Sequence, residues 1–247
     1  TFGQNAMIRI GNTEMHRLLP VQSLMRGCLL NDDGTVREYL SPSNWAAHDL
    51  SGANGQVMVE IPEHYRRFDD VAYQGTIRRH AVMISLEPFE GATLVPKCYI
   101  GAYEGYVSDN KLCSVSGVRP TTSMSRTTFR TRARARNNDT KWNLLGYEVY
   151  KNLFWLYFIE YANFDSQAAV NTARDANGYR QGGLGIGISN VSNWQAYNSY
   201  SSITNTGVSN GLGNDSGEVT EAASNYVNAG VTLTTSDNLV HTNRYRG

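Results

Sequence analysis

Residues 144–162, with the sequence LLGYEVYKNLFWLYFIEYA, form the densest hydrophobic run of the 247-residue chain. Apolar side chains recur in this run at steps of three and four residues, which places them on one face of a helix. They are Leu145, Val149, Leu153, Leu156 and Ile159. Aromatic residues widen this apolar face, so we predict a core helix that is buried on most of its sides. Charged residues interrupt the run too often for a membrane span, which needs about 20 mainly apolar residues.

The rest of the chain is rich in Gly, Ser, Thr, Asn and Tyr; 40% of all residues are hydrophobic and only 18% are charged. This composition is more typical of a loop-rich extracellular or virion surface protein than of a cytosolic enzyme. The 22 basic side chains balance the 22 acidic ones, so no overall field attracts nucleic acid or an anionic membrane. The sequence therefore predicts neither a nucleic-acid partner nor insertion into a membrane.

The three cysteines, Cys28, Cys98 and Cys113, are odd in number and show no CxxC spacing. We therefore expect no disulfide framework and no zinc site, while a single disulfide bridge remains open. The chain begins at Thr1, and nothing in it resembles a signal peptide or a lipidation signal. We expect either that the chain is processed or that its start lies upstream.

Apolar segments in the first part of the chain predict short strands. The MIRI segment at residues 7–10 is one candidate, and the apolar segment that follows it is broken at Pro20 and Gly27. Residues 57–61 alternate between Val or Ile and other residues, as a half-buried strand should, and Pro62 ends this strand.

Two further segments continue the strand pattern. Residues 75–86 and residues 95–106 both carry the apolar and β-branched residues that strands favour. Glycine inside a strand often marks a bulge or a place where another backbone comes close. We therefore expect such a feature at Gly101 and at Gly105.

Two polar clusters in this half admit a chemical interpretation as well as a structural one. Residues 31–34, NDDG, predict a turn, because Asp and Asn bond their own backbone and Gly supplies a positive φ. A calcium loop would need more acidic ligands at alternate positions. Glu60, Glu63 and His64 could form an acid/base or metal group, but a surface ion pair is the favoured interpretation.

Residues 125–136, SRTTFRTRARAR, hold the one charged cluster, with arginines at positions 126, 130, 132, 134 and 136. As a helix, the segment would have Ser125 as its N-cap; as a strand, it would place four arginines on one face. Phe129 could stack on a base, which favours a nucleic-acid interface. Because the cluster is short and the chain is neutral, we expect instead structural arginines that pair with carboxylates.

Beyond Gly182 the chain becomes rich in Gly, Asn, Ser and Tyr. The glycines there match neither GxGxxG nor a Walker A loop with its Lys. Aromatic side chains alternate with amides and hydroxyls, the mixture that recognition loops and sugar-binding sites use, although an ordinary polar loop has the same composition. The candidate ligand-binding residues are Asn190, Asn193, Trp194, Tyr197, Asn198, Tyr200, Asn205 and Asn210.

Several segments together resemble a known family, the phage and prophage adhesins of gut Bacteroidales. These segments are IRIGNTEMHRLLPVQSLMRGCLLNDDG, SGANGQVMVEIPEHYRRF, VPKCYIGAYEGY, SRTTFRTRARARNNDTKWNLLGYEVYKNLFWLYFIEYANFDSQ and QGGLGIGISN. The resemblance covers most of residues 7–190 in order. It implies an α+β, C-type-lectin-like fold of the formylglycine-generating-enzyme type, in which small twisted antiparallel sheets pack on a long core helix. In members diversified by retroelements, substitutions concentrate after the Gly-Gly-Leu-Gly segment, which here corresponds to residues 190–214.

The resemblance also implies a division of the chain. Residues 1–120 would form a β-rich part and residues 121–247 a lectin-like ligand-binding part, or the two would form one continuous domain. The resembling proteins continue past the segment that matches RYRG at residues 244–247 into a strand that closes the fold. We therefore expect either that a second polypeptide completes the fold or that the sequence is trimmed.

The function that the resemblance implies is that of a non-enzymatic receptor-binding protein, a phage tail fibre or surface adhesin. Its partners would be a host surface glycan or protein and other virion proteins, and it would be a homo-oligomer on the virion or extracellular surface, without cofactor, metal or catalytic residues. A structural fibre or capsid-decorating component is the alternative. A glycan hydrolase would need two carboxylates, and Asp215 with Glu218 is the only acidic pair near the loops.

Overall fold

The computed structural model describes residues 19–42, 44–73, 77–161, 205–207, 218–220, 225–228, 231–234 and 240–242. The strand predicted at residues 7–10 lies outside these ranges, as does most of the candidate loop region at residues 190–214. Within the described ranges the chain is a mixed α+β protein of several small antiparallel sheets and two helices. This confirms the predicted fold class at the level of α+β.

The central sheet has four antiparallel strands in the order β2-β1-β3-β7. They are β1 (Arg26–Leu30), β2 (Val36–Tyr39), β3 (Gln56–Ile61) and β7 (Cys98–Gly101). Strand β3 confirms the prediction for residues 57–61, but all of its residues are buried. The half-buried interpretation was wrong, because Cys28, Leu30 and Met58 form a second small core on the other face, with Trp142 packed against it.

Glycine 27 does not break the chain as predicted; it lies inside β1. A Cβ atom at this position would come within 2.5 Å of Cζ2 of Trp45, a residue of the short 3-10 helix η3 (Trp45–Ala47). The indole ring therefore packs directly on the backbone of β1, and only glycine leaves room for it. A second 3-10 turn, η2 (Gln22–Leu24), leads into the strand.

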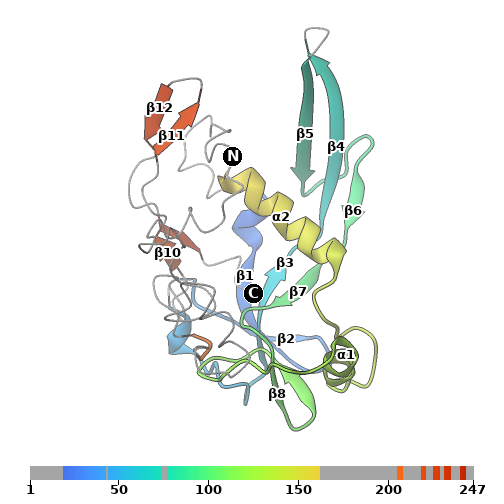
Figure 1. The fold of residues 1–247 in the computed structure, drawn as a ribbon, viewed down its shortest axis with the longest axis vertical. Coiled ribbons are helices and arrows are strands. Elements are labelled where there is room, and N and C mark those ends of the chain that lie inside the picture. The colour runs from blue at the N-terminus through green and yellow to red at the C-terminus, as the bar shows by residue number, and fades with distance from the viewer. Residues whose placement is uncertain are drawn as a thin grey trace.

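A second sheet has the strand order β5-β4-β6 and carries the longest hairpin of the described structure. Its strands are β4 (His64–Tyr73), β5 (Ile77–Ser85) and β6 (Thr93–Val95). Strand β5 confirms the strand predicted over residues 75–86. In Figure 1 the β4–β5 hairpin and helix α1 (Arg126–Arg134) lie at opposite ends of the long axis.

The strand predicted over residues 95–106 is divided among β6, β7 and β8 (Tyr106–Ser108), and β8 pairs with β9 (Lys111–Cys113). The close backbone approach expected at Gly101 is confirmed, because a Cβ atom there would lie 3.2 Å from the carbonyl oxygen of Tyr103. At Gly105 a Cβ atom would lie 2.8 Å from Cδ1 of Leu112, so a side chain and not another backbone comes close. Glycine leaves room for these neighbours at both positions.

The arginine segment, which the sequence left open between helix and strand, is the helix α1. Ser125 caps α1, since its hydroxyl accepts a hydrogen bond from the backbone N–H of Thr128. Helix α2 (Tyr147–Tyr161) confirms the helix predicted from the hydrophobic run. Its burial is narrower than predicted: Leu156 is fully buried, whereas Tyr147 is 72% exposed.

Helix α2 joins the two sheets (Figure 1). Leu156 belongs to the main core with residues of β3, and Trp155 contacts Phe68 of β4 edge to face at a centroid distance of 5.3 Å. Two polar side chains, Asn152 and Glu160, are buried one turn to either side of Leu156. The buried face is therefore a stripe at four-residue steps.

Two further strand pairs follow toward the C-terminus. They are β10 (Glu218–Thr220) with β13 (Val240–Thr242), and β11 (Asn225–Asn228) with β12 (Val231–Thr234). Both pairs are antiparallel. Among the residues that the structure describes, no helix is both long and apolar enough to cross a membrane.

Candidate functional site

One of the eight predicted ligand-binding residues, Asn205, lies in the described part of the chain. It is exposed, and the residue after it, Thr206, is buried. The other seven lie outside the described residues: Asn190, Asn193, Trp194, Tyr197, Asn198, Tyr200 and Asn210. What the structure describes of the candidate site is therefore the point where its loop segment meets the core.

Residues 205–207 bind to residues 115–118, and we call this pair of segments the loop anchor. The backbone N–H of Thr206 donates to the carbonyl of Val118 at 2.8 Å, and the N–H of Gly117 donates to the carbonyl of Thr206 at 2.8 Å. The Thr206 hydroxyl donates to the carbonyl of Val115 at 2.7 Å and accepts from the N–H of Val118 at 3.2 Å. The Asn205 side-chain amide donates to the carbonyl of Gly117 at 3.0 Å.

Ser114 connects the loop anchor to the central sheet. Its hydroxyl donates to the carbonyl of Val57 at 2.7 Å, and the N–H of Val57 donates to the Ser114 carbonyl at 2.9 Å. The Gln56 side chain accepts from the Ser114 N–H at 2.8 Å. All three residues are buried, so the anchor is supported by hydrogen bonds to a strand inside the core.

A close packing contact also holds residue 115 in place. Gly52 has a φ of +92°, and a Cβ atom at this position would lie 2.6 Å from Cγ1 of Val115. The Ser116 N–H donates to the carbonyl of Leu50 at 3.0 Å. The turn at residues 50–52 therefore closes over the strand that leads to the anchor.

Glu60 is buried in the central sheet and binds groups from three neighbouring segments. Its carboxylate accepts from the Tyr39 hydroxyl at 3.0 Å and from Nζ of Lys97 at 3.2 Å, and Nε of Arg26 lies 3.8 Å away. Burial alone would raise the pKa of Glu60, but the hydrogen bonds from Lys97 and Tyr39 outweigh burial and lower it. Glu60 is thus an ionised structural carboxylate: the predicted ion pair is formed, with Lys97, but Glu60 is buried and does not lie on the surface.

His64 is fully buried and connects the β4 strand to helix α2. Its Nδ1 lies 2.8 Å from the carbonyl oxygen of Pro62, and its Nε2 lies 3.0 Å from Oδ1 of Asn152. Nη1 of Arg66 donates to the same Asn152 oxygen at 3.0 Å. Among the described residues His64 and Glu60 share no partner, and Glu63 is exposed. These three side chains are therefore not arranged as the joint acid/base or metal group that was the less favoured interpretation.

The turn at residues 31–34 is confirmed, and cationic side chains engage its first carboxylate. Nη1 of Arg136 lies 2.7 Å from Oδ1 of Asp32, and Nζ of Lys111 lies 2.8 Å from Oδ2. Burial would raise the pKa of Asp32, but these hydrogen bonds and charges lower it. Within the described ranges, no group of three His, Cys, Asp or Glu side chains could hold a metal ion.

The arginine cluster divides into two kinds of residue. Arg136 is buried, pairs with Asp32 and lies over the ring of Trp142, as expected of a structural arginine. The other four make no ion pair or side-chain hydrogen bond with any residue that the structure describes, so the predicted pairing is confirmed for Arg136 alone. These four are Arg126, Arg130, Arg132 and Arg134.

The three cysteines are free thiols. Burial raises the pKa of Cys28 to about 12 and also raises the pKa of Cys98. A thiol with a raised pKa is a poor nucleophile at neutral pH, since the thiolate is the reactive form. Because all three thiols are free, the single disulfide bridge that the sequence left open is not formed.

Comparison of the chain with protein-family models, curated proteins and solved structures finds no match.

The loop anchor was missed by sequence reasoning, because Gln56, Ser114 and Thr206 are ordinary polar residues in their local context. The glycines and asparagines around Thr206 marked a loop but not the contact that it makes 88 residues away. No local motif could have revealed this pairing.

Proposed function

We propose that this protein is a non-enzymatic receptor-binding protein, a phage or prophage tail fibre or surface adhesin. Its ligand is a glycan or protein on the host-cell surface, bound by the loop segment at residues 190–214. The scaffold is a C-type-lectin-like fold in which small antiparallel sheets and the α2 helix support the loops. The resemblance of the sequence segments and the composition of the loop support this proposal.

The structural observation that supports it best is the loop anchor. Recognition loops bind well when a rigid scaffold holds their ends, because less conformational entropy is then lost on binding. Thr206 supplies such a fixed point inside the segment, with three hydrogen bonds to the backbone of Val115, Gly117 and Val118 at 2.7 to 2.8 Å. Ser114 transmits this support to β3.

The mixture of residues that precede the anchor in the sequence suits surface recognition. Trp194 and Tyr197 would offer ring faces for sugar rings or apolar side chains, and Asn193 and Asn198 would offer amide donors and acceptors. Binding of this kind requires neither a metal nor a nucleophile. Glu60, His64 and Asp32 each have structural partners.

Imaging of the assembled particle or fibre tests the proposal against the structural alternative. Receptor binding predicts that residues 190–214 lie on an exposed, distal surface. Burial of the same residues between subunits would contradict receptor binding and favour a structural fibre or capsid-decorating component.

A further inference from the structure

We propose that α1 carries a second binding surface, the arginine stripe, and that its ligand is an acidic polysaccharide bearing carboxylate or sulfate groups. The stripe consists of Arg126, Arg130 and Arg134, which are spaced at four-residue steps and therefore share one side of the helix. The choice of a polysaccharide rests on the proposed function as a binder of cell surfaces. The presence of an anion-binding surface rests on the observations that follow.

The N-terminal part of the stripe is electrostatically unfavourable for the isolated helix. Like charges at positions i and i+4 repel, and Arg126 lies in the first turn, where the positive end of the helix dipole disfavours a cation. Of the stripe, the dipole favours Arg134 alone, which lies in the last turn. The first turn contains no acidic residue. Arg136, just beyond the helix, shows the contrast: its charge is balanced by Asp32 at 2.7 Å. Charges that destabilise the helix and have no carboxylate partner among the described residues indicate that an external anion binds them.

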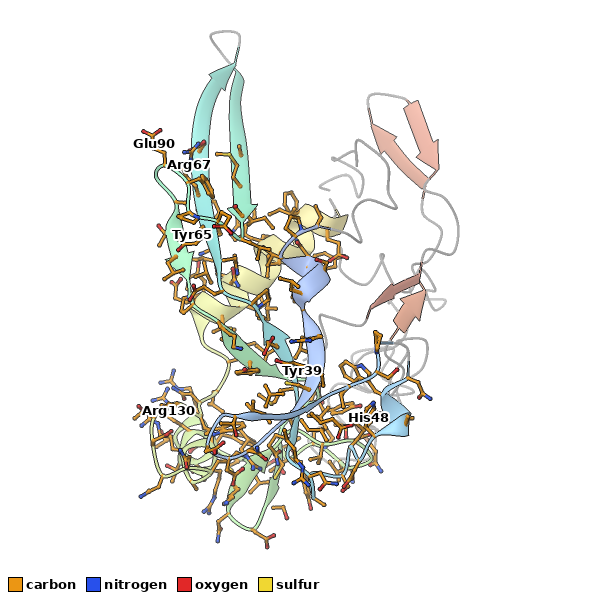
Figure 2. The ribbon with its side chains drawn as sticks, turned by 180° about the vertical axis from the view of Figure 1, so that it is seen from behind. Tyr39, His48, Tyr65, Arg67, Glu90 and Arg130 are labelled. Carbon is orange, nitrogen blue, oxygen red and sulfur yellow. The ribbon has the colours of Figure 1, made fainter. Side chains whose placement is uncertain are left out.

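Two guanidinium groups of the stripe are also partly dehydrated. The Nε atoms of Arg130 and Arg134 are buried and, among the described residues, have no hydrogen-bond partner. A cation that has already lost part of its hydration attracts an anion more strongly than a fully solvated one. In Figure 2, Arg130 lies at the outer edge of the molecule, on the side opposite His48. A long polymer therefore has access to this surface.

The spacing of the stripe suits a linear polyanion. Successive arginines are separated by one helical turn, about 6 Å at 1.5 Å per residue. Guanidinium groups bind carboxylates and sulfates through two parallel hydrogen bonds, so repeated acidic groups along one chain can engage several arginines at once. A flexible acidic polysaccharide meets these requirements.

Nucleic acid fits the same surface less well. Base recognition on single strands uses exposed aromatic rings, but Phe129 is half-buried, and the Trp142 indole N–H donates to the Asp32 carbonyl at 2.7 Å. Binding of duplex DNA depends on many phosphate contacts, whereas the chain as a whole carries no net charge and offers few such contacts. The observations therefore favour the polysaccharide.

The test measures binding of the full chain to immobilised dextran sulfate and polygalacturonate, with neutral dextran and mixed-sequence DNA beside them. We expect wild type to bind both acidic polysaccharides more tightly than dextran or DNA, and to release them as salt rises. Arg126→Gln/Arg130→Gln should weaken this binding by at least about tenfold. The control Arg37→Gln/Lys141→Gln removes the same charge from other exposed positions and should change it less than about twofold.

Equal losses in the two double variants, or DNA binding as tight as polysaccharide binding, would overturn the proposal. So would a wild-type protein that does not distinguish dextran sulfate from dextran. Folding is checked by the melting temperature, which we expect to stay the same or rise because like-charge repulsion in α1 is relieved. Failure here is distinguishable from failure of the proposed function, since that function is tested on loop residues Trp194 and Tyr197, which this experiment leaves intact.

Discussion

Thr206 is hydrogen-bonded to Val118, which lies 88 residues earlier in the sequence. The Thr206 N–H donates to the Val118 carbonyl at 2.8 Å, and the Val118 N–H donates to the Thr206 hydroxyl at 3.2 Å. Short polar segments rarely stay buried without such complete pairing of their backbone groups. Thr206 is only 8% exposed although its neighbour Asn205 lies in solvent. The contact therefore fixes one point of an otherwise polar loop on the core.

Replacing Thr206 by Val should loosen the loop anchor. The substitution keeps the shape of the side chain but leaves the Val115 carbonyl and the Val118 N–H without the hydroxyl, so we expect a loss of about 1–3 kcal/mol in unfolding free energy. Thr206→Ser keeps the hydroxyl and should cost clearly less. Denaturant unfolding of both variants measures the difference; equal stabilities would show that the hydroxyl contributes nothing.

Asp32 should contribute to stability in a pH-dependent manner. Its pKa is lowered in the folded protein, so the stabilisation is present above the unfolded pKa and is lost as pH falls through the folded pKa. Asp32→Asn should therefore lower stability at neutral pH, by about 1 kcal/mol given that the carboxylate is partly exposed, and the loss should shrink in acid.

Thermal unfolding of Asp32→Asn between neutral pH and pH 3 checks this sign. The matched control is Asp109→Asn, because Asp109 lies in an exposed turn and forms no ion pair with the described residues. Its stability should follow wild type across the range. A stability difference between Asp32→Asn and wild type that grew toward low pH would contradict the assignment.

The buried face of α2 should be far more sensitive to truncation than the exposed Leu145, which lies just before the helix. Leu156 is 0% exposed, so Leu156→Ala should cost about 2–5 kcal/mol through lost burial and the cavity left behind. Leu145 is 60% exposed, and Leu145→Ala should change stability by less than about 0.5 kcal/mol. Urea midpoints of the two variants give the comparison, and similar losses would refute the narrow buried stripe.

Cys28 should resist thiol reagents in the native protein. Its thiol is buried and its pKa is about 12, so the reactive thiolate is scarce at neutral pH. Labelling with iodoacetamide followed by peptide mass spectrometry should show Cys28 unmodified in native conditions and modified after unfolding. Native labelling of Cys28 at the rate seen in urea would contradict this burial.

Local patterns predicted much of the fold. The strands β3 and β5, the cap at Ser125 and the existence of α2 follow from periodicity and capping, which act within a few residues. The two-sided burial of β3 could not be foreseen, because Trp142, which covers its outer face, lies far along the chain. Gly27 was misjudged for the same reason, since Trp45 decides its role.

The candidate site was predicted less completely than the fold. Composition indicated a polar aromatic loop around Asn205, but the loop anchor depends on the pairing of Thr206 with residues 115–118, which no spacing rule encodes. The burial of Asn152 and Glu160 on α2 was not predicted either, because the hydrophobic pattern considers only the apolar positions. Tertiary contacts decided each of these cases.

The most direct measurement of the central claim is the affinity of purified protein for host cells or a glycan array after Trp194→Ala/Tyr197→Ala. Loss of two aromatic contacts should weaken binding by at least about tenfold with an unchanged melting temperature. The matched control Tyr147→Ala/Tyr150→Ala removes two rings that are 72% and 57% exposed on α2 and should bind as wild type does. A folded loop variant that binds as tightly as wild type would contradict the claim that residues 190–214 recognise the receptor.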